Sequence, residues 1–326
     1  MATVGVIGAG AVGCYYGAML ARAGHDVRFV MRRDLEAVRE RGLEVRSHEG
    51  DFHLRSVTAC ATAEEVGPVD WLVCALKTTA LDSARPLLAP CVGRTTRIVA
   101  LMNGLGLEER LAAWFGPERI FGAMAFVCIN RGLPGVVHHL KYGRLSVGHL
   151  LDRPEENGAL VDLLQSAGID VVAAPNLRYA RWEKLCWNIP FNGLSVAGGG
   201  IGTEVIVRDP QLRAMAARTM GEVVAVGNAD LAALRNVAWL DPGEIVPRMF
   251  GLTDSMGDYH TSMAIDYVLG RALEVETILG EPARRAAAMG VAVPTIDALY
   301  ALVATADRRR RGLIPAIREN EAGSVA

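Results

Sequence analysis

A short run of β-forming residues is followed at once by a glycine-rich turn near the start of the chain. The run is Thr3 to Ile7, and the turn reads Gly8-Ala9-Gly10-Ala11-Val12-Gly13. A helical pattern extends from the turn to Ala23, and Gly24 follows it as glycine commonly follows helices. Asp26 to Met31 then has the character of a second strand. Strand, glycine turn, helix and strand within about 30 residues predict a unit that binds a dinucleotide.

Each glycine of this turn has a mechanical task in such a unit. Gly8 permits the tight turn, Gly10 lets the backbone approach a pyrophosphate, and Gly13 allows the helix to pack closely on the strand. The residues between them, Ala9, Ala11 and Val12, complete the turn and open the helix, whose N-terminus faces the phosphates with its positive dipole end. An ordinary glycine loop is the alternative, and the flanking strand and helix favour dinucleotide binding.

Strand-like and helical segments continue to alternate along the first half of the chain. Alternation of this kind predicts an α/β fold, here a Rossmann-type doubly wound parallel sheet with helices on both faces. The stretch 120–150 contains β-like pieces broken by Gly and Pro, and we expect it to extend the sheet with a hairpin or antiparallel strands. The other predicted segments are strands at 69–76, 97–102 and 170–173, and helices at 80–88, 107–115 and 159–167.

The pattern changes after Pro175 to long helical periodicities with few strands. We therefore predict two domains, a dinucleotide-binding Rossmann domain at 1–174 and a mostly α-helical domain at 175–326, which we expect to supply the substrate and catalytic residues. A chain of 326 residues is long enough for two cores. The predicted helices of the second domain cover 178–189, 210–236, 242–257, 261–289 and 294–306.

Charge and cysteine usage exclude several classes of protein. The net charge of −2 argues against nucleic acid or membrane surfaces as partners, and no apolar run reaches the ~18 residues of a membrane span. The six cysteines form no C-x-x-C pair and no metal-ligand spacing, so we expect no metal and reduced, buried thiols. We also see no signal peptide and expect a cytoplasmic protein. The Arg308–Arg311 run is interpreted as the solvated end of the last helix.

The residues after the second strand indicate which dinucleotide binds. A site for NAD places an acidic residue there for the ribose 2′-hydroxyl, whereas a site for NADP places cationic groups for the 2′-phosphate. This chain has Arg32 and Arg33, with no acid before Asp34. The sequence therefore predicts NADPH/NADP as the cofactor, and the alternative is that either arginine is merely a surface residue.

Only three lysines occur in the chain, and one of them begins a row of polar residues. They are Lys77, Lys141 and Lys184, and lysine, unlike arginine, can give up a proton near neutral pH in a tuned site. Lys184, Asn188 and Asn192 stand four residues apart, which places them on one face of a helix among apolar neighbours. A polar ligand would explain this face, and a hydrogen-bond network between domains is the alternative.

Two further polar residues follow predicted strands of the first domain. Lys77 comes directly after the strand at 69–76, and Asn103 follows the strand at 97–102. Ligands of open α/β sheets bind outside the carboxyl ends of the strands, so both residues are candidates for a site. Asn103-Gly104 alone is also typical of a turn.

Taken in order, these motifs resemble the ketopantoate reductase (2-dehydropantoate 2-reductase) family over nearly the whole chain. The resemblance includes GAGAVG at 8–13, LK at 76–77, NG-x-G at 103–106 and PG-x-x-x-H at 134–139. It continues through W-x-KL-x-x-N-x-x-x-N at 182–192 and ends with Ser262-Met263, Asp266, Arg271 and Glu274. The ordered set is specific, whereas no single piece would be.

The resemblance implies a role for each matching residue. Lys184 matches the catalytic lysine, the general acid that protonates the carbonyl oxygen, and Glu274 matches the acidic residue that orients substrate and lysine. Arg32 matches the contact to the 2′-phosphate. Lys77 and Asn103 match positions near the nicotinamide, and Asn103 also contacts substrate. The residues implied to hold the substrate are Asn103, Lys184, Asn188, Asn192 and Ser262.

Helical geometry limits how these residues can act together. Ser262 and Glu274 are twelve residues apart, which is about 18 Å along one continuous helix. They cannot both touch a small substrate unless the segment bends, and Gly270 is a candidate for the bend. An ion pair between Glu274 and Arg271 on a solvated face is the alternative role for the glutamate.

The resemblance implies NADPH-dependent reduction of a 2-oxo acid, specifically 2-dehydropantoate to (R)-pantoate, a step towards pantothenate and coenzyme A. Gly193, Gly202 and Tyr259 depart from the family's pattern, which leaves the identity of the 2-oxo acid open. The alternatives are the same chemistry on another bulky 2-oxo compound, or a non-catalytic NADP-binding regulator. Either a monomer or a homodimer is compatible with the sequence.

Overall fold

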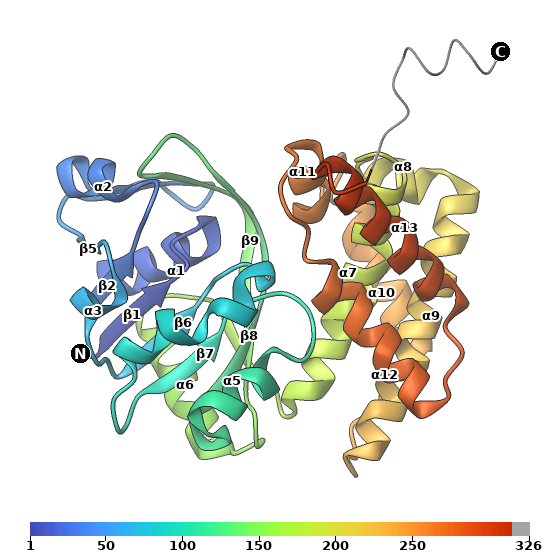
Figure 1. The fold of residues 1–326 in the computed structure, drawn as a ribbon, viewed down its shortest axis with the longest axis horizontal. Helices are drawn as coiled ribbons and strands as arrows, with labels where there is room; N and C mark the ends of the chain where they lie inside the picture. The colour runs from blue at the N-terminus through green and yellow to red at the C-terminus, as the bar shows by residue number, and fades with distance from the viewer. Residues whose placement is uncertain (315–326) are drawn as a thin grey trace. The chain divides into compact units, whose positions relative to one another are not determined.

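The computed structural model describes residues 1–314, and the chain divides into two compact units, Met1–Ala180 and Arg181–Ala326. The first unit contains a mixed sheet with helices on both of its faces, and the second is helical (Figure 1). This architecture confirms the predicted fold class. The division lies inside the helix α7 (Leu177–Ala197), a few residues after the predicted boundary at 174/175.

The sheet of the first unit has a Rossmann-type strand order on one side of its centre. Strands β5, β2, β1, β6, β7 and β8 are neighbours in that order, and all five pairings between them are parallel. The order reverses between β1 and β6, which is where ligands bind in such sheets. The strands are β1 (Thr3–Ile7), β2 (Asp26–Val30), β5 (Thr58–Cys60), β6 (Trp71–Cys74), β7 (Arg97–Ala100) and β8 (Ile120–Arg131).

The other side of the sheet is mixed. A long hairpin of β8 and β9 (Val136–His149) is antiparallel, as predicted for the stretch 120–150. Strands β3 (Leu43–Ser47) and β10 (Val171–Ala173) pair with β9, and β4 (Phe52–Leu54) pairs with β3. The sequence patterns did not predict β3, β4 or β5, because strands of three to five half-exposed residues give little periodicity.

Two apolar clusters hold the helices of the first unit to opposite faces of the sheet. Successive residues of β1 divide between them, since Val6 belongs to one cluster and Ile7 to the other. The helices are α1 (Ala11–Arg22), α2 (Leu35–Arg41), α3 (Ala63–Val66), α4 (Arg85–Leu88), α5 (Leu107–Phe115) and α6 (Pro154–Ser166). The helix predicted at 80–88 was wrong in kind: a 3₁₀ turn at Thr78–Ser83 precedes the single turn of α4.

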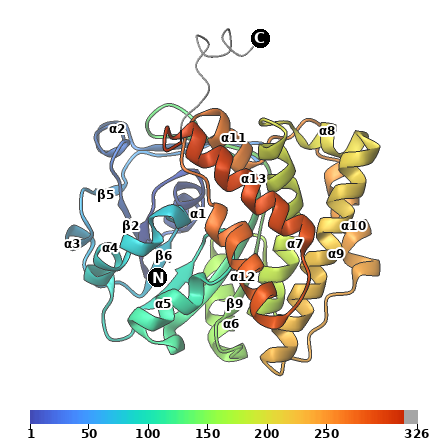
Figure 2. The ribbon, with the colours of Figure 1, turned by 45° about the vertical axis from the view of Figure 1, so that its right-hand side comes forward.

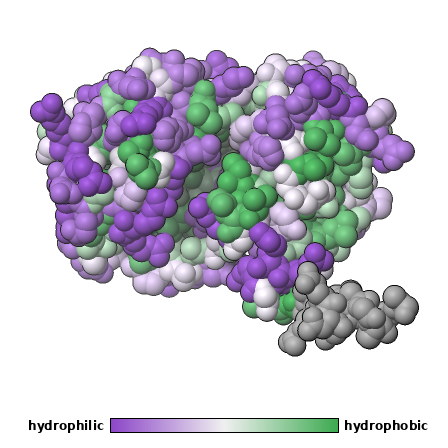
Figure 3. All heavy atoms as spheres, turned by 90° about the horizontal axis from the view of Figure 1, so that it is seen from above, coloured by the Kyte–Doolittle hydropathy of each residue, from purple (hydrophilic) through white to green (hydrophobic). Residues whose placement is uncertain are grey.

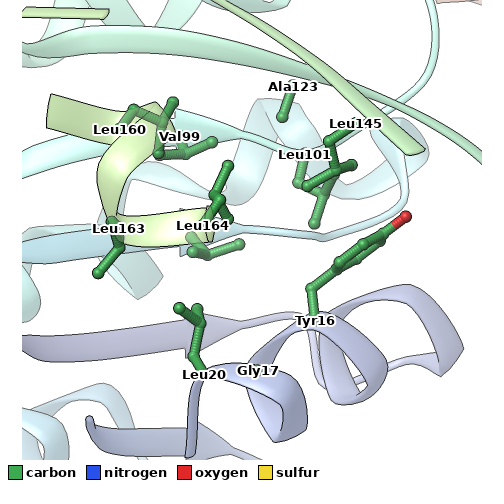
Figure 4. Close-up of a pocket in the computed structure, with 11 residues that line it drawn as sticks. Tyr16, Gly17, Leu20, Val99, Leu101, Ala123, Leu145, Leu160, Leu163 and Leu164 are labelled. Carbon is green, nitrogen blue, oxygen red and sulfur yellow. The ribbon is translucent and has the colours of Figure 1, made fainter. Parts of the chain in front are cut away.

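One small cavity lies within this core, between the sheet and the helices α1 and α6 (Figure 4). It has a volume of about 20 Å³ and is lined by apolar side chains, among them Leu20, Val99 and Leu164. The ring of Tyr16 also lines it, while the Tyr16 hydroxyl donates to the main-chain oxygen of Gly143 at 3.1 Å. A cavity this small and apolar is a packing gap rather than a cofactor site.

The second unit is built from helices around the buried C-terminal part of α7. Figure 2 shows α13 crossing in front of α7, and Gly193 of α7 lies close enough to Leu299 of α13 that an added Cβ would be 3.0 Å from its side chain. The other helices are α8 (Thr203–Arg208), α9 (Pro210–Ala233), α10 (Pro242–Asp254), α11 (Ser262–Val268), α12 (Glu281–Met289) and α13 (Pro294–Arg310).

The continuous helix predicted at 261–289 was wrong. Helix α11 ends at Val268, Gly270 adopts a positive φ of 66°, and residues 271–274 have no regular secondary structure. Helical structure resumes with a π-helical turn, η4 (Glu276–Gly280), that leads into α12. Gly270 does form the bend that the distance between Ser262 and Glu274 requires, because only glycine adopts this backbone conformation at little cost.

Helix α7 has well-defined ends. At its start Asp152 accepts the Leu177 N–H at 3.0 Å, and the Asn176 side-chain oxygen accepts the Tyr179 N–H at 2.7 Å. It continues past Pro190, eight residues further than predicted, because the ring removes only one hydrogen bond from a helix buried on most sides. At its end the Gly200 N–H donates to the Ser195 oxygen at 2.7 Å, as in a Schellman cap.

The face in Figure 3 is mainly hydrophilic, with separate hydrophobic areas. Within residues 1–314, no helix is both long and apolar enough to cross a membrane. Over the same range, no three His, Cys, Asp or Glu side chains gather where they could hold a metal ion.

Candidate active site

Four parallel strands of the first unit end at the same level. Ile7 of β1 is in register with Val30 of β2 and with Cys74 of β6, and Cys74 is in register with Ala100 of β7. The chain therefore leaves the sheet at one edge in all four cases. We call the residues that follow these ends, 8–13, 31–34, 75–78 and 101–104, the cofactor edge.

The glycine turn occupies the centre of this edge. Gly8 has a φ of 99°, and a Cβ there would lie 2.4 Å from the Ala75 carbonyl carbon. A Cβ on Gly13 would lie 2.4 Å from the Gly8 oxygen. A Cβ on Gly10, by contrast, would meet nothing closer than 3.9 Å. Gly8 and Gly13 are thus required by packing, whereas Gly10 keeps open space next to the backbone.

The start of α1 offers donors to a ligand in that space. Gly10 is the N-cap of the helix, no side chain caps it, and its first turn carries no acidic residue. The first N–H groups of a helix lack intrahelical partners and carry the positive end of its dipole. This arrangement fits a pyrophosphate, so the residues present are suited to a dinucleotide.

Lys77 and Asn103 lie at the same edge. Each follows its strand by three residues, Lys77 after Cys74 of β6 and Asn103 after Ala100 of β7. Lys77 is exposed and Asn103 is half-buried. The structure brings both residues to the edge that carries the glycine turn.

The segment after β2 separates the two candidate arginines. Arg33 donates to Asp34 at 3.1 Å and to the Gly132 main-chain oxygen at 3.2 Å. Arg32 is exposed. Among the described residues 1–314, its guanidinium has no hydrogen-bond or ion-pair partner. Arg32 is therefore the arginine available to an added phosphate, in agreement with its position in the motif.

The second unit presents the polar row of α7. Lys184 is half-buried, while Asn188 and Asn192 are 4% and 3% exposed. The Lys184 Nζ lies 5.8 Å from the centre of the Trp187 ring, within the range of a cation–π contact. The Asn192 side-chain N–H donates to the Asn188 main-chain oxygen at 2.9 Å. The spacing of four residues has placed all three polar groups on one face, as predicted.

Ser195 extends this face by one more turn, and the sequence interpretation missed it. It is fully buried and stands eleven residues, about three turns, after Lys184. The Ser195 hydroxyl and the Asn192 side-chain oxygen are buried without a hydrogen-bond partner among the described residues. Buried polar atoms without partners are rare, so these two indicate a place for a polar ligand or water. A step of three residues past Asn192, which a helix also keeps on the same face, would have found it.

Ser262 and Glu274 belong to the segment that bends at Gly270. Ser262 is exposed at the start of α11, and Glu274 is half-buried just before helical structure resumes. Arg271 forms its ion pair with Asp266 at 3.6 Å rather than with Glu274. The alternative role for Glu274, a surface ion pair with Arg271, is therefore not supported.

Two family models together match most of the chain. Residues 4–152 match the family model described as ketopantoate reductase PanE/ApbA, and residues 176–307 match the model of its C-terminal part. A 2-dehydropantoate 2-reductase from Nostoc is 37% identical over 94% of this chain and 95% of its own length. The chain belongs to the ketopantoate reductase family.

Solved structures of family members have the same fold. The 2-dehydropantoate 2-reductase of Geobacter metallireducens is 42% identical, with a TM-score of 0.89 over 93% of this chain and 99% of that one. The enzyme of Methylococcus capsulatus is 33% identical, with a TM-score of 0.84 over 94% and 97%. The chain is thus an oxidoreductase of a family that uses NADPH and acts on 2-oxo acids, which confirms the predicted enzyme class and the cofactor at the level of the family.

Residues that depart from the ketopantoate reductase pattern lie just after α7 and near the rings beside its lysine. Gly199 and Gly200, which precede Gly202 in the chain, have φ values of 82° and 99° and follow the end of α7. A Cβ on Gly202 would lie 2.0 Å from a carboxylate oxygen of Asp258, so a side chain there requires the aspartate to move. Tyr259 places its ring 6.4 Å from that of Trp187, the ring beneath Lys184. Trp187 and Tyr259 therefore place aromatic rings near the lysine, and we call these two rings the aromatic wall.

Other candidate proton donors, His139 and the six cysteines, are buried within the fold. His139 is buried, and its two ring nitrogens contact the Ser47 hydroxyl at 2.8 Å and the Tyr142 main-chain oxygen at 2.6 Å. Burial lowers the pKa of His139. The six cysteines are free thiols and buried, and burial raises the pKa of Cys74 to about 12. None of these groups is placed to act as an acid at neutral pH.

Proposed function

We propose that this enzyme reduces 2-dehydropantoate (ketopantoate) to (R)-pantoate with NADPH, a step in pantothenate and coenzyme A biosynthesis. The row of Lys184, Asn188 and Asn192 on α7, in a member of the ketopantoate reductase family, is the observation that carries this proposal. The first unit would bind the cofactor and the second would supply the catalytic and substrate-binding residues. A cytoplasmic location and a monomer or homodimer remain predictions.

The cofactor edge would hold NADPH through the main chain of residues 8–13 and through Arg32. The helix N-terminus favours the pyrophosphate, and an arginine fork suits the 2′-phosphate. Lys77 and Asn103, at the ends of neighbouring strands, would contact the nicotinamide half. When bound, NADPH supplies the hydride that reduces the keto carbon.

Lys184 would act as the general acid. Its ammonium group donates a proton to the carbonyl oxygen as the carbon–oxygen double bond becomes a single bond, and solvent then returns the proton to the amine. Contact with the Trp187 ring stabilises the charged form of the lysine, and Glu274 would orient it. The products of this step are the 2-hydroxy acid and NADP⁺, so atoms and charge balance.

The polar neighbours on α7 would hold the substrate. Asn188 and Asn192 present amides to the hydroxyl and carboxylate groups of a 2-oxo acid, and the unpartnered Asn192 oxygen can accept a substrate hydroxyl. Ser262, exposed at the first turn of α11, would contribute its hydroxyl and main-chain N–H. Asn103 would contact the substrate as well as the cofactor.

Steady-state oxidation of NADPH with a panel of 2-oxo acids tests this function. The panel contains ketopantoate, pyruvate, 2-oxoisovalerate and phenylglyoxylate, the last chosen because of the aromatic wall formed by Trp187 and Tyr259. We expect the highest kcat/KM with ketopantoate. A higher kcat/KM with another acid would overturn the specific substrate, and no turnover with any acid, with NADPH still bound, would overturn the enzymatic role.

A further inference from the structure

An acidic residue at the cofactor edge, Asp34, forms ion pairs with two arginines. Asp34 is 6% exposed, and each of its carboxylate oxygens has its own cationic partner. Arg33 lies 3.1 Å from one oxygen, and Arg131 lies 2.5 Å from the other. The Asp34 charge is thus neutralised from both sides.

Arg131 reaches this place from a distant part of the sheet. It is the last residue of β8, and three strands separate β8 from β2 in the sheet. The tip of the β8–β9 hairpin, residues 131–135, returns to the β2–α2 connection, as the loop near α2 in Figure 1 shows. Gly132 accepts from Arg33 at 3.2 Å, and the Gly135 oxygen accepts the Glu44 N–H at 2.9 Å. Three hydrogen-bonded contacts therefore fix the hairpin tip beside Asp34.

The Asp34 side chain pairs with the two arginines and does not cap its own helix, α2. It stands at the N-cap of α2, where an aspartate commonly accepts a main-chain N–H, yet it makes no such bond. The ion pair between Asp34 and Arg131 also lies near α1, the helix that begins in the glycine turn. Burial raises the pKa of the Cys14 thiol in α1 to about 12, and Arg131 opposes this rise while Asp34 adds to it.

An acid in this region matters for the choice of cofactor. At the end of the second strand, a free carboxylate accepts the ribose hydroxyls of NAD and repels the 2′-phosphate of NADP. Asp34 lies two residues after Arg32, the arginine available to that phosphate. Neutralising Asp34 removes the repulsion and also removes an acceptor for the ribose.

We propose that Arg131 is a specificity-determining positioning residue, which selects NADPH over NADH by masking the carboxylate of Asp34. Arg131 acts on the cofactor through Asp34 and does not itself contact the phosphate. This inference rests on the proposed function, because it presupposes that NADPH binds at the cofactor edge.

Equilibrium binding of NADPH and of NADH to the full-length protein tests the inference, with the fluorescence of the reduced nicotinamide as the readout. The variants are Arg131→Gln, Asp34→Asn, the double variant of both, and Arg131→Lys, which keeps the charge. Arg144→Gln is the matched control, since Arg144 also lies on the hairpin and pairs with an exposed acid, Asp170, at 2.7 Å.

We expect Arg131→Gln to lower the preference for NADPH, expressed as Kd(NADH)/Kd(NADPH), by about tenfold, as one like charge near a phosphate does when partly shielded from water. The double variant should regain the NADPH affinity of Asp34→Asn. Arg131→Lys and Arg144→Gln should keep the ratio of the wild type.

Two results would overturn the inference while leaving the proposed function intact. One is an unchanged ratio in Arg131→Gln with NADPH still bound. The other is an equal loss of NADPH affinity from Arg131→Gln in the Asp34→Asn background, which would mean that Arg131 binds the phosphate directly. A wild-type protein that binds neither cofactor would instead overturn the proposed function itself.

Discussion

The cofactor edge of the first unit and the polar face of α7 in the second build their sites from different atoms. At the edge, Gly8, Gly10 and Gly13 matter because they lack side chains, which lets main-chain groups approach one another and leaves open space beside Gly10. On α7, the roles proposed for Lys184 and Asn192 depend on the polar ends of their side chains. A site of the first kind fails when an atom is added, and a site of the second kind fails when one is removed.

The largest effect should come from the α7 face. Replacing Lys184 by Ala removes the proposed proton donor, so kcat should fall by roughly 10²- to 10⁴-fold. The Kd of NADPH should stay within about twofold of the wild-type value, since the proposed cofactor site does not include α7 and distant sites act independently. Steady-state kinetics and cofactor fluorescence measure the two quantities.

Two matched variants sharpen this test. Lys184→Arg keeps the positive charge but cannot give up a proton, so it should be nearly as inactive as Lys184→Ala. Lys141→Ala removes an exposed lysine of β9 and should leave kcat unchanged. If Lys184→Ala retained the activity of the wild type, lysine 184 would not be the acid.

Adding atoms at the glycine turn should give the opposite pattern. A side chain at Gly10 meets open space, so Gly10→Val should fold with a nearly unchanged Tm. It should weaken NADPH binding by about 100-fold, because each lost charge-assisted hydrogen bond costs about 1.5–3 kcal/mol. The Kd of NADPH and thermal unfolding are the measurements.

The comparison variant is Gly13→Val, whose Cβ would clash with the Gly8 oxygen. It should lower Tm as well as NADPH affinity, because the helix can no longer pack closely on the strand. Equal losses of stability in both variants would show that Gly10, too, is needed for packing only.

A smaller effect is expected at Asn192. Asn192→Ala removes an amide whose oxygen has no partner among the described residues, so KM for the 2-oxo acid should rise by about tenfold while stability changes little. Asn228→Ala is the control, since the Asn228 amide both donates to and accepts from Leu240, at 3.0 and 2.8 Å. It should cost about 1–3 kcal/mol of stability and leave KM unchanged. A loss of stability in Asn192→Ala with an unchanged KM would make Asn192 a structural residue.

The smallest effect concerns acid stability at the opposite edge of the sheet. Asp70 accepts the Thr3 N–H and hydroxyl at 2.8 and 2.7 Å, and the N–H bond contributes most to lowering its pKa. A carboxyl whose pKa is lower in the folded state than in the unfolded state stabilises the folded state when the pH is above the unfolded pKa of about 3.9. This stabilisation is lost as the pH falls through the folded-state pKa. Asp70→Asn should therefore flatten the decline in stability below about pH 4 and leave NADPH binding unchanged. An identical decline in the variant would show that other carboxyls dominate.

The two regions also differ in how far the sequence predicts them. The glycine turn and the strands around it follow from local pattern, since each residue acts on neighbours a few positions away. The row from Lys184 to Asn192 follows from a regular four-residue spacing, whereas the buried Ser195 stands three residues after Asn192 and does not continue that spacing. The masking of Asp34 by Arg131 could not be predicted, because it depends on a hairpin tip returning across the sheet.

The break after α11 illustrates the same limit. The segment 261–289 has a helical pattern, and only the distance between Ser262 and Glu274 argued for a bend. Gly270 provides it through a backbone conformation that apolar periodicity does not record. The short strands β3 to β5 were missed because pairing with distant strands, and not their own composition, makes them strands.

The most direct test of the central claim follows the hydride itself. The enzyme is incubated with ketopantoate and NADPH that carries deuterium at the transferred C4 position, and the product is analysed by mass spectrometry. We predict (R)-pantoate with one deuterium on C2, and no such product from Lys184→Ala under the same conditions. Unlabelled pantoate, or oxidation of NADPH without a 2-hydroxy acid, would contradict the account.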